Sequence, residues 1–99
     1  MAPAELEALL AGLLLVWQVP AALSVRRDGE DLCATVEGPA GAVTVGYSVP
    51  SFGPLWRVQE AGRRPRTYPS TIGMIRHLRE ALAPERGAAR VVFAPGAVG

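Results

Sequence analysis

The stretch ALSVRRDGEDLCATVE, residues 22–37, carries the clearest structural signal in this 99-residue chain. Asp28 and Gly29 separate two runs rich in apolar residues, and this dipeptide tolerates the positive φ angles that a two-residue type I′ turn requires. The sequence therefore predicts a β-hairpin. Folding about this turn places opposite charges face to face and fixes the register: Arg27 with Glu30, and Arg26 with Asp31.

Further strands are expected after the hairpin. Apolar and polar residues alternate over residues 43–49, as in a strand with one buried face. Residues 55–60 put Trp56 and Val58 on one face, and residues 64–68 form a short fifth strand. Because Pro65 has no N–H to donate, that fifth strand is expected at a sheet edge or beside a bulge. The pattern is that of a five-strand meander.

A helix is expected on each side of the meander. In residues 4–17, leucines recur at the three- and four-residue spacing of one apolar helix face. Ser70 is the expected N-cap of a second helix that ends near Pro84. A last strand is expected at residues 90–94. The predicted buried face of the second helix consists of Ile72, Ile75, Leu78 and Leu82.

Together these elements predict an α+β protein with a mainly antiparallel sheet of five to six strands and two helices on one face. The order is helix, five-strand meander, helix, strand. The length fits one domain over residues 1–99. The tail from about residue 95 is expected to fray, since it contains only Ala, Pro, Gly and Val.

The uncharged run at residues 8–25 raises the question of a membrane segment. A secretory signal needs a positive N-terminal region, whereas Glu5 and Glu7 make this one negative. Gln18 and Pro20 shorten the apolar run below the roughly 20 residues that a spanning helix needs. We therefore expect no membrane partner and a cytoplasmic location.

Residue types exclude several kinds of chemistry. The chain has no lysine, so Schiff-base chemistry and a P-loop lysine are excluded. Cys33 and His77 are the only residues of their types, which rules out an internal disulfide and a His pair. The residues four positions before and after His77 are Gly73 and Ala81, which cannot orient an imidazole. We predict a protein without enzymatic activity, cofactor or bound metal.

Charge is distributed unevenly along the chain. Residues 1–54 hold two arginines and six acids, a net charge of −4, whereas residues 55–99 hold eight arginines and three acids, a net charge of +5. This asymmetry favours an anionic partner for the basic half, and it also permits head-to-tail self-association. The absence of lysine and asparagine is typical of a GC-rich genome, which weakens the case that any arginine was selected for function.

The arginines of the fourth and fifth strands are interleaved with Trp56 and Tyr68, and two more arginines follow on the second helix. Guanidinium groups bind phosphates bidentately, and aromatic rings stack on bases. The leading prediction is a small accessory or regulatory protein that binds DNA or RNA through an arginine-rich β-hairpin and the following helix. The candidate binding residues are Arg57, Arg63, Arg64, Arg66, Tyr68, Arg76 and Arg79.

The alternative is a protein-interaction or assembly subunit that uses the same arginine and aromatic surface as its interface. Such a subunit binds another protein or a second copy of itself. The candidate residues for an oligomer interface are Leu13, Leu14 and Trp17 on the first helix. Leu15 and Val16, on the other side of that helix, are expected in a second buried contact or at a subunit interface.

Overall fold

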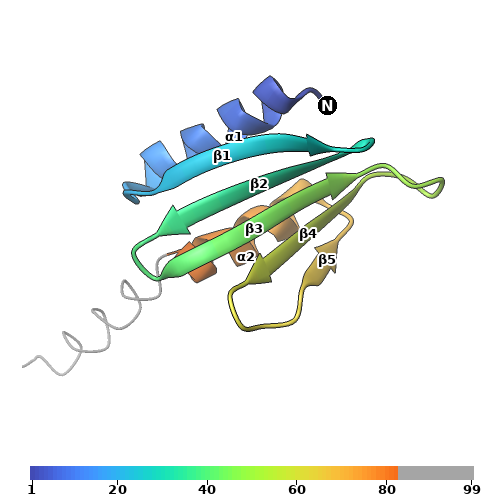
Figure 1. Cartoon of the computed structure of the whole chain (residues 1–99). Coiled ribbons are helices and arrows are strands. Elements are labelled where there is room, and N and C mark those ends of the chain that lie inside the picture. The colour runs from blue at the N-terminus through green and yellow to red at the C-terminus, as the bar shows by residue number, and fades with distance from the viewer. Residues whose placement is uncertain (83–99) are drawn as a thin grey trace, which may run out of the picture.

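Two helices cover the same side of an open antiparallel sheet, and this arrangement confirms the predicted α+β fold (Figure 1). The computed structural model describes residues 1–82, so the strand predicted at 90–94 and the tail lie outside the described part. The elements are α1 (Pro3–Trp17), β1 (Ala22–Asp28), β2 (Asp31–Gly38), β3 (Gly41–Ser48), β4 (Leu55–Glu60), β5 (Arg66–Tyr68) and α2 (Thr71–Leu82).

The sheet is a meander in which every strand pairs with its neighbours in the chain. Its order is β1-β2-β3-β4-β5, and all four pairings are antiparallel. The short β5 therefore lies at an edge, as predicted, and Pro65 directly precedes it. This position leaves the ladder intact, because the proline nitrogen is not needed as a donor.

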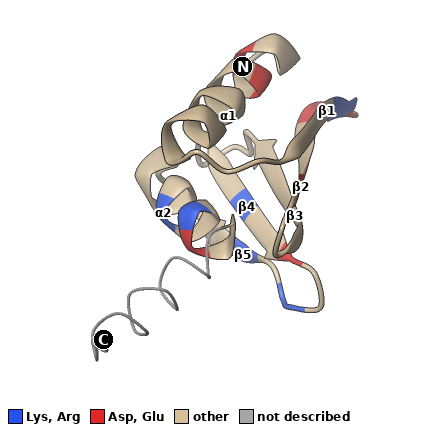
Figure 2. Ribbon diagram, turned by 90° about the vertical axis from the view of Figure 1, so that its left-hand side faces the viewer, with Lys and Arg blue, Asp and Glu red and all other residues tan. Residues whose placement is uncertain are grey.

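The core lies between the sheet and the two helices, which Figure 2 shows on one side of it. Alternate residues of each strand point toward the helices, because successive side chains of a strand project to opposite faces. The core side chains are Leu6, Leu10, Leu14 and Trp17 from α1; Leu32, Ala34 and Val36 from β2; Val43 and Val45 from β3; Trp56 and Val58 from β4; Met74, Leu78 and Leu82 from α2; and Val19 between α1 and β1.

Both ends of α1 satisfy backbone groups that the helix itself leaves unpaired. At the start, Pro3 occupies the first helical position and the Ala2 N–H donates to Glu5 Oε1 over 2.6 Å. At the end, Gln18 adopts a left-handed conformation with φ of 57°. The Val19 N–H then donates to the Leu14 carbonyl, and the helix ends at Trp17, three residues before Pro20.

The predicted register of the β1–β2 hairpin is wrong: the turn lies one residue later than predicted, so each β1 residue pairs two residues further along β2. Asp28 pairs with Asp31, so the turn residues are Gly29 and Glu30, and only Gly29 has a positive φ, 66°. A glycine at the first turn position is the preference of a type II′ turn rather than type I′. Arg26 consequently faces Cys33, and none of the predicted hairpin ion pairs forms within residues 1–82.

The buried face of α2 differs from the predicted one at its first turn. Leu78 and Leu82 are buried as expected, but Met74 takes the third buried position and Ile72 is 68% exposed. Two residues along a helix are separated by about 200° around its axis, so Ile72 and Met74 cannot both face the sheet. The row at positions 74, 78 and 82 gives one continuous line of contact.

The predicted second contact of α1 is absent from residues 1–82. Leu15 and Val16 are 79% and 77% exposed, so neither packs in a buried contact there.

Replacing Leu10 by alanine is expected to lower the free energy of unfolding by about 2–5 kcal/mol, because a fully buried leucine leaves a cavity. The same change at Leu15, on the exposed side of α1, is expected to alter it by less than about 0.5 kcal/mol. Urea unfolding followed by circular dichroism measures both values. Equal losses for the two variants would show that α1 does not dock on the sheet as described.

Candidate functional site

The hairpin formed by β4 and β5 makes one wall of a hollow beside α2. Glu60 lies on the same face of β4 as the buried Trp56 and Val58, since positions 56, 58 and 60 alternate with exposed ones. Trp56 pairs with Tyr68 and Val58 with Arg66, so the latter two project to the same side. The pleat therefore directs Glu60, Arg66 and Tyr68 toward α2.

The first turn of α2 is tied to this hairpin. The Gly73 N–H donates to Ser70 Oγ over 3.1 Å, which confirms Ser70 as the N-cap, and the Trp56 indole N–H donates to Thr71 Oγ1 over 3.2 Å. A β-carbon at Gly73 would lie 3.0 Å from Cδ1 of Tyr68. Glycine at this position therefore leaves room for the tyrosine ring against the helix.

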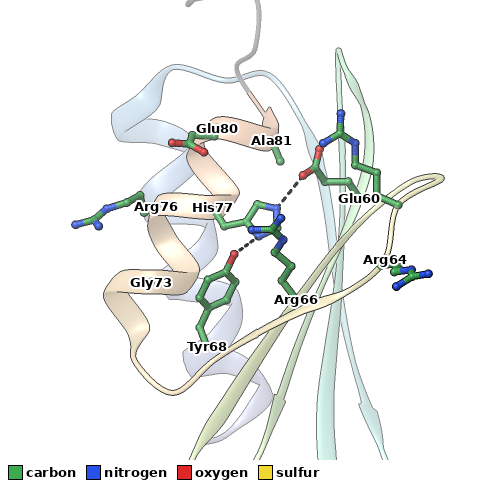
Figure 3. Close-up of a pocket in the computed structure, with 10 residues that line it drawn as sticks. Glu60, Arg64, Arg66, Tyr68, Gly73, Arg76, His77, Glu80 and Ala81 are labelled. Atoms are coloured by element: carbon green, nitrogen blue, oxygen red, sulfur yellow. Dashed lines mark hydrogen bonds and ion pairs between the residues drawn. The ribbon is translucent and has the colours of Figure 1, made fainter.

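Tyr68, His77 and Glu60 form a hydrogen-bonded chain across the hollow (Figure 3). The Tyr68 hydroxyl lies 2.6 Å from His77 Nδ1, and His77 Nε2 lies 2.8 Å from Glu60 Oε2. The tyrosine and histidine rings also meet edge to face, with centroids 5.5 Å apart. Three elements, β4, β5 and α2, thus hold one polar chain.

The partners of His77 determine the direction of both hydrogen bonds when its ring is neutral. The Glu60 carboxylate only accepts, so His77 Nε2 carries the proton and donates it. Nδ1 is then the acceptor, and the Tyr68 hydroxyl donates to it. The side chains of His77 and Glu60 are only 13% and 28% exposed, so this chain is largely shielded from water.

Four arginines, at positions 63, 64, 66 and 76, line the same hollow as these three hydrogen-bonded side chains. The space between the hairpin and α2 has a volume of about 920 Å³, and we call it the arginine hollow. None of its arginine side chains forms an ion pair or hydrogen bond with another residue among 1–82. In Figure 3, Arg64 and Arg76 extend outward on opposite sides of the Tyr68–His77–Glu60 chain. The lining residues are Glu60, Arg63, Arg64, Arg66, Tyr68, Gly73, Arg76, His77, Glu80 and Ala81.

The structure brings five of the seven candidate binding residues together and separates the other two. The five that line the hollow are Arg63, Arg64, Arg66, Tyr68 and Arg76. Arg57 lies on the opposite face of the sheet, next to Gly46, because its position alternates with Trp56 and Val58. Arg79 is exposed on α2 and does not line the hollow.

The candidate oligomer residues lie mostly within the protein's own core. Leu14 and Trp17 are each 8% exposed, and Leu13 is half-buried against the core. The exposed apolar side chains of α1 are instead Leu15 and Val16. An oligomer interface on this helix stays a prediction, and these two residues are the ones accessible to a second copy.

Sequence reasoning missed the role of Glu60 and the partners of His77. Helical spacing indicates only partners one turn from His77, whereas Glu60 is 17 residues away and belongs to another element. The alternation of β4 contains the missing signal, since it places a carboxylate in line with Trp56 and Val58 on the face that the helices cover. A carboxylate so placed requires a donor from the neighbouring helix.

Comparison with protein-family models, with curated proteins and with solved structures gives no match to this chain. Within residues 1–82, neither helix combines the length and apolar character needed to cross a bilayer. The same residues contain no group of three His, Cys, Asp or Glu side chains arranged to hold a metal ion.

Replacing Tyr68 by phenylalanine is expected to lower the free energy of unfolding by about 0.5–1.5 kcal/mol, because it leaves the partly buried His77 Nδ1 without its hydrogen-bond partner. Tyr47→Phe is the matched control, since the Tyr47 hydroxyl has no hydrogen-bond partner among residues 1–82 and its ring contact with Trp56 is retained. Urea unfolding compares the two variants. Similar stabilities would mean that the hydrogen bond to His77 does not form in solution.

Proposed function

We propose that the protein binds nucleic acid through the arginine hollow. One observation carries this proposal: four arginines line a single hollow, and none is paired with an acid among residues 1–82. Clustered like charges repel one another and destabilise a compact protein. Such a cluster is useful when an anionic ligand neutralises it, and a guanidinium group suits phosphate because it donates two parallel hydrogen bonds.

The acids in the hollow do not cancel this charge. Glu60 is engaged with His77, which leaves Glu80 as the one other acid among the described lining residues. Arg63, Arg64 and Arg66 follow one another along the hairpin, and Arg76 approaches from α2. Donors on two sides of the hollow suit successive phosphates of one strand better than a single isolated anion.

The concave shape favours a single strand over a duplex. Proteins read duplex DNA with a protruding helix or ribbon that enters a groove. A flexible single strand instead lays its phosphates and sugars into a basic groove with aromatic side chains. The hollow, with Tyr68 in its wall, fits the second mode.

Fluorescence anisotropy of a labelled single-stranded oligonucleotide, from about 50 to 200 mM salt, tests this proposal. The wild-type protein is expected to bind with an affinity that falls steeply as salt rises. The double variant Arg63→Ala/Arg66→Ala is expected to reduce the slope of log affinity against log salt by about 1.4, since each single-strand phosphate contact contributes about 0.7.

The matched control is Arg26→Ala/Arg27→Ala, which removes the same charge from β1, outside the hollow. This variant is expected to keep the wild-type slope. Absence of binding at the lowest salt, or equal loss of slope in both double variants, would overturn the proposal. The arginine surface would then be best explained as an interface with another protein.

A further inference from the structure

We infer that the arginine hollow prefers RNA to DNA because the Tyr68 oxygen accepts a hydrogen bond from a ribose 2′-hydroxyl. This inference rests on the proposed function and specifies its substrate class. It depends on the proton positions in the Tyr68–His77–Glu60 chain. These positions leave the tyrosine hydroxyl able to accept a hydrogen bond from a ligand but not to donate one.

The single proton of the Tyr68 hydroxyl is already used. When the imidazole is neutral, the Glu60 carboxylate can only accept from His77 Nε2, which leaves Nδ1 to accept the tyrosine proton across the 2.6 Å contact. The tyrosine oxygen therefore has no proton left to donate, but it retains lone pairs. A ligand atom that meets this oxygen in the hollow has to be a hydrogen-bond donor.

The rest of the lining requires the same ligand to carry hydrogen-bond acceptors as well. Arg63, Arg66 and Arg76 only donate hydrogen bonds, so they require acceptor oxygens on the ligand. The hollow thus presents donors from its arginines beside an acceptor from Tyr68. A suitable ligand combines anionic oxygens with a nearby hydroxyl group.

An RNA strand provides this combination at every nucleotide. Its 2′-hydroxyl is adjacent to the 3′-phosphate and acts as donor and acceptor, and this group is what lets a protein distinguish RNA from DNA. A DNA strand offers the same phosphates to the arginines, but it has no sugar hydroxyl within the strand to donate to Tyr68. The N–H groups of the bases occur in both polymers and give no discrimination.

Anisotropy at pH 8, where neutral imidazole is the ordinary form of histidine, tests the preference with three oligomers of one sequence. These are oligouridylate, the same oligomer with 2′-fluorine, and oligodeoxyuridylate. The fluorine retains an RNA-like sugar but cannot donate a hydrogen bond. The wild-type protein is expected to bind oligouridylate roughly two- to tenfold more tightly than the other two, as one hydrogen bond predicts.

Tyr68→Phe is expected to bind the RNA and 2′-fluoro oligomers equally, whereas Tyr47→Phe retains the wild-type preference. Equal wild-type affinities for RNA and 2′-fluoro RNA would overturn the inference, even if Tyr68→Phe proved too unstable to use. If all three oligomers bind equally and the slope still depends on Arg63 and Arg66, the proposed function stands and the RNA preference is wrong. If none binds at about 50 mM salt, the proposed function itself fails.

Discussion

The alternation of side chains along the strands is the constraint on which both the core and the candidate site depend. Among residues 1–82, helices cover one face of the sheet, so every second residue of a strand must suit a buried environment. In β4 this rule buries Trp56 and Val58, and it carries Glu60 to the same side. The carboxylate therefore lies beside α2, where His77 satisfies it.

The same alternation explains why the arginines divide into two groups. Arg66 pairs with Val58 and projects toward the helices, whereas Arg57 is one position out of phase and projects from the uncovered face. Arg63 and Arg64 lie in the connection between β4 and β5, where the Arg63 N–H donates to the Glu60 carbonyl over 3.0 Å. A basic cluster on one side of the sheet is thus a consequence of strand phase and turn geometry.

Local patterns in the sequence were sufficient for most of the fold. The leucine spacing predicted α1, the apolar alternation predicted β3 and β4, and Ser70 predicted the start of α2. The β1–β2 register was wrong because Val25 faces the helices whether it pairs with Leu32 or with Ala34, so hydrophobic alternation does not distinguish the two. In the observed turn only Gly29 has a positive φ, as in a type II′ turn.

The candidate site was only partly predictable, because its chemistry depends on contacts between distant parts of the chain. The run from Arg63 to Tyr68 identified the basic hairpin, since those residues are close in sequence. Arg57 does not belong to this cluster, because it alternates with Trp56 and Val58 and projects from the other face of β4. The partners of His77 come from β4 and β5, and no spacing along α2 contains that information.

Nitrogen NMR of the imidazole ring is the most direct test of the central claim, because His77 is the only histidine in the chain and gives a single set of ring signals. We predict that the neutral ring carries its proton on Nε2 in the untagged protein, and that saturation with oligouridylate shifts the Nδ1 resonance. A ring proton on Nδ1, or a spectrum unchanged by saturating oligouridylate, would contradict the claim that Tyr68, His77 and Glu60 organise a nucleic-acid site.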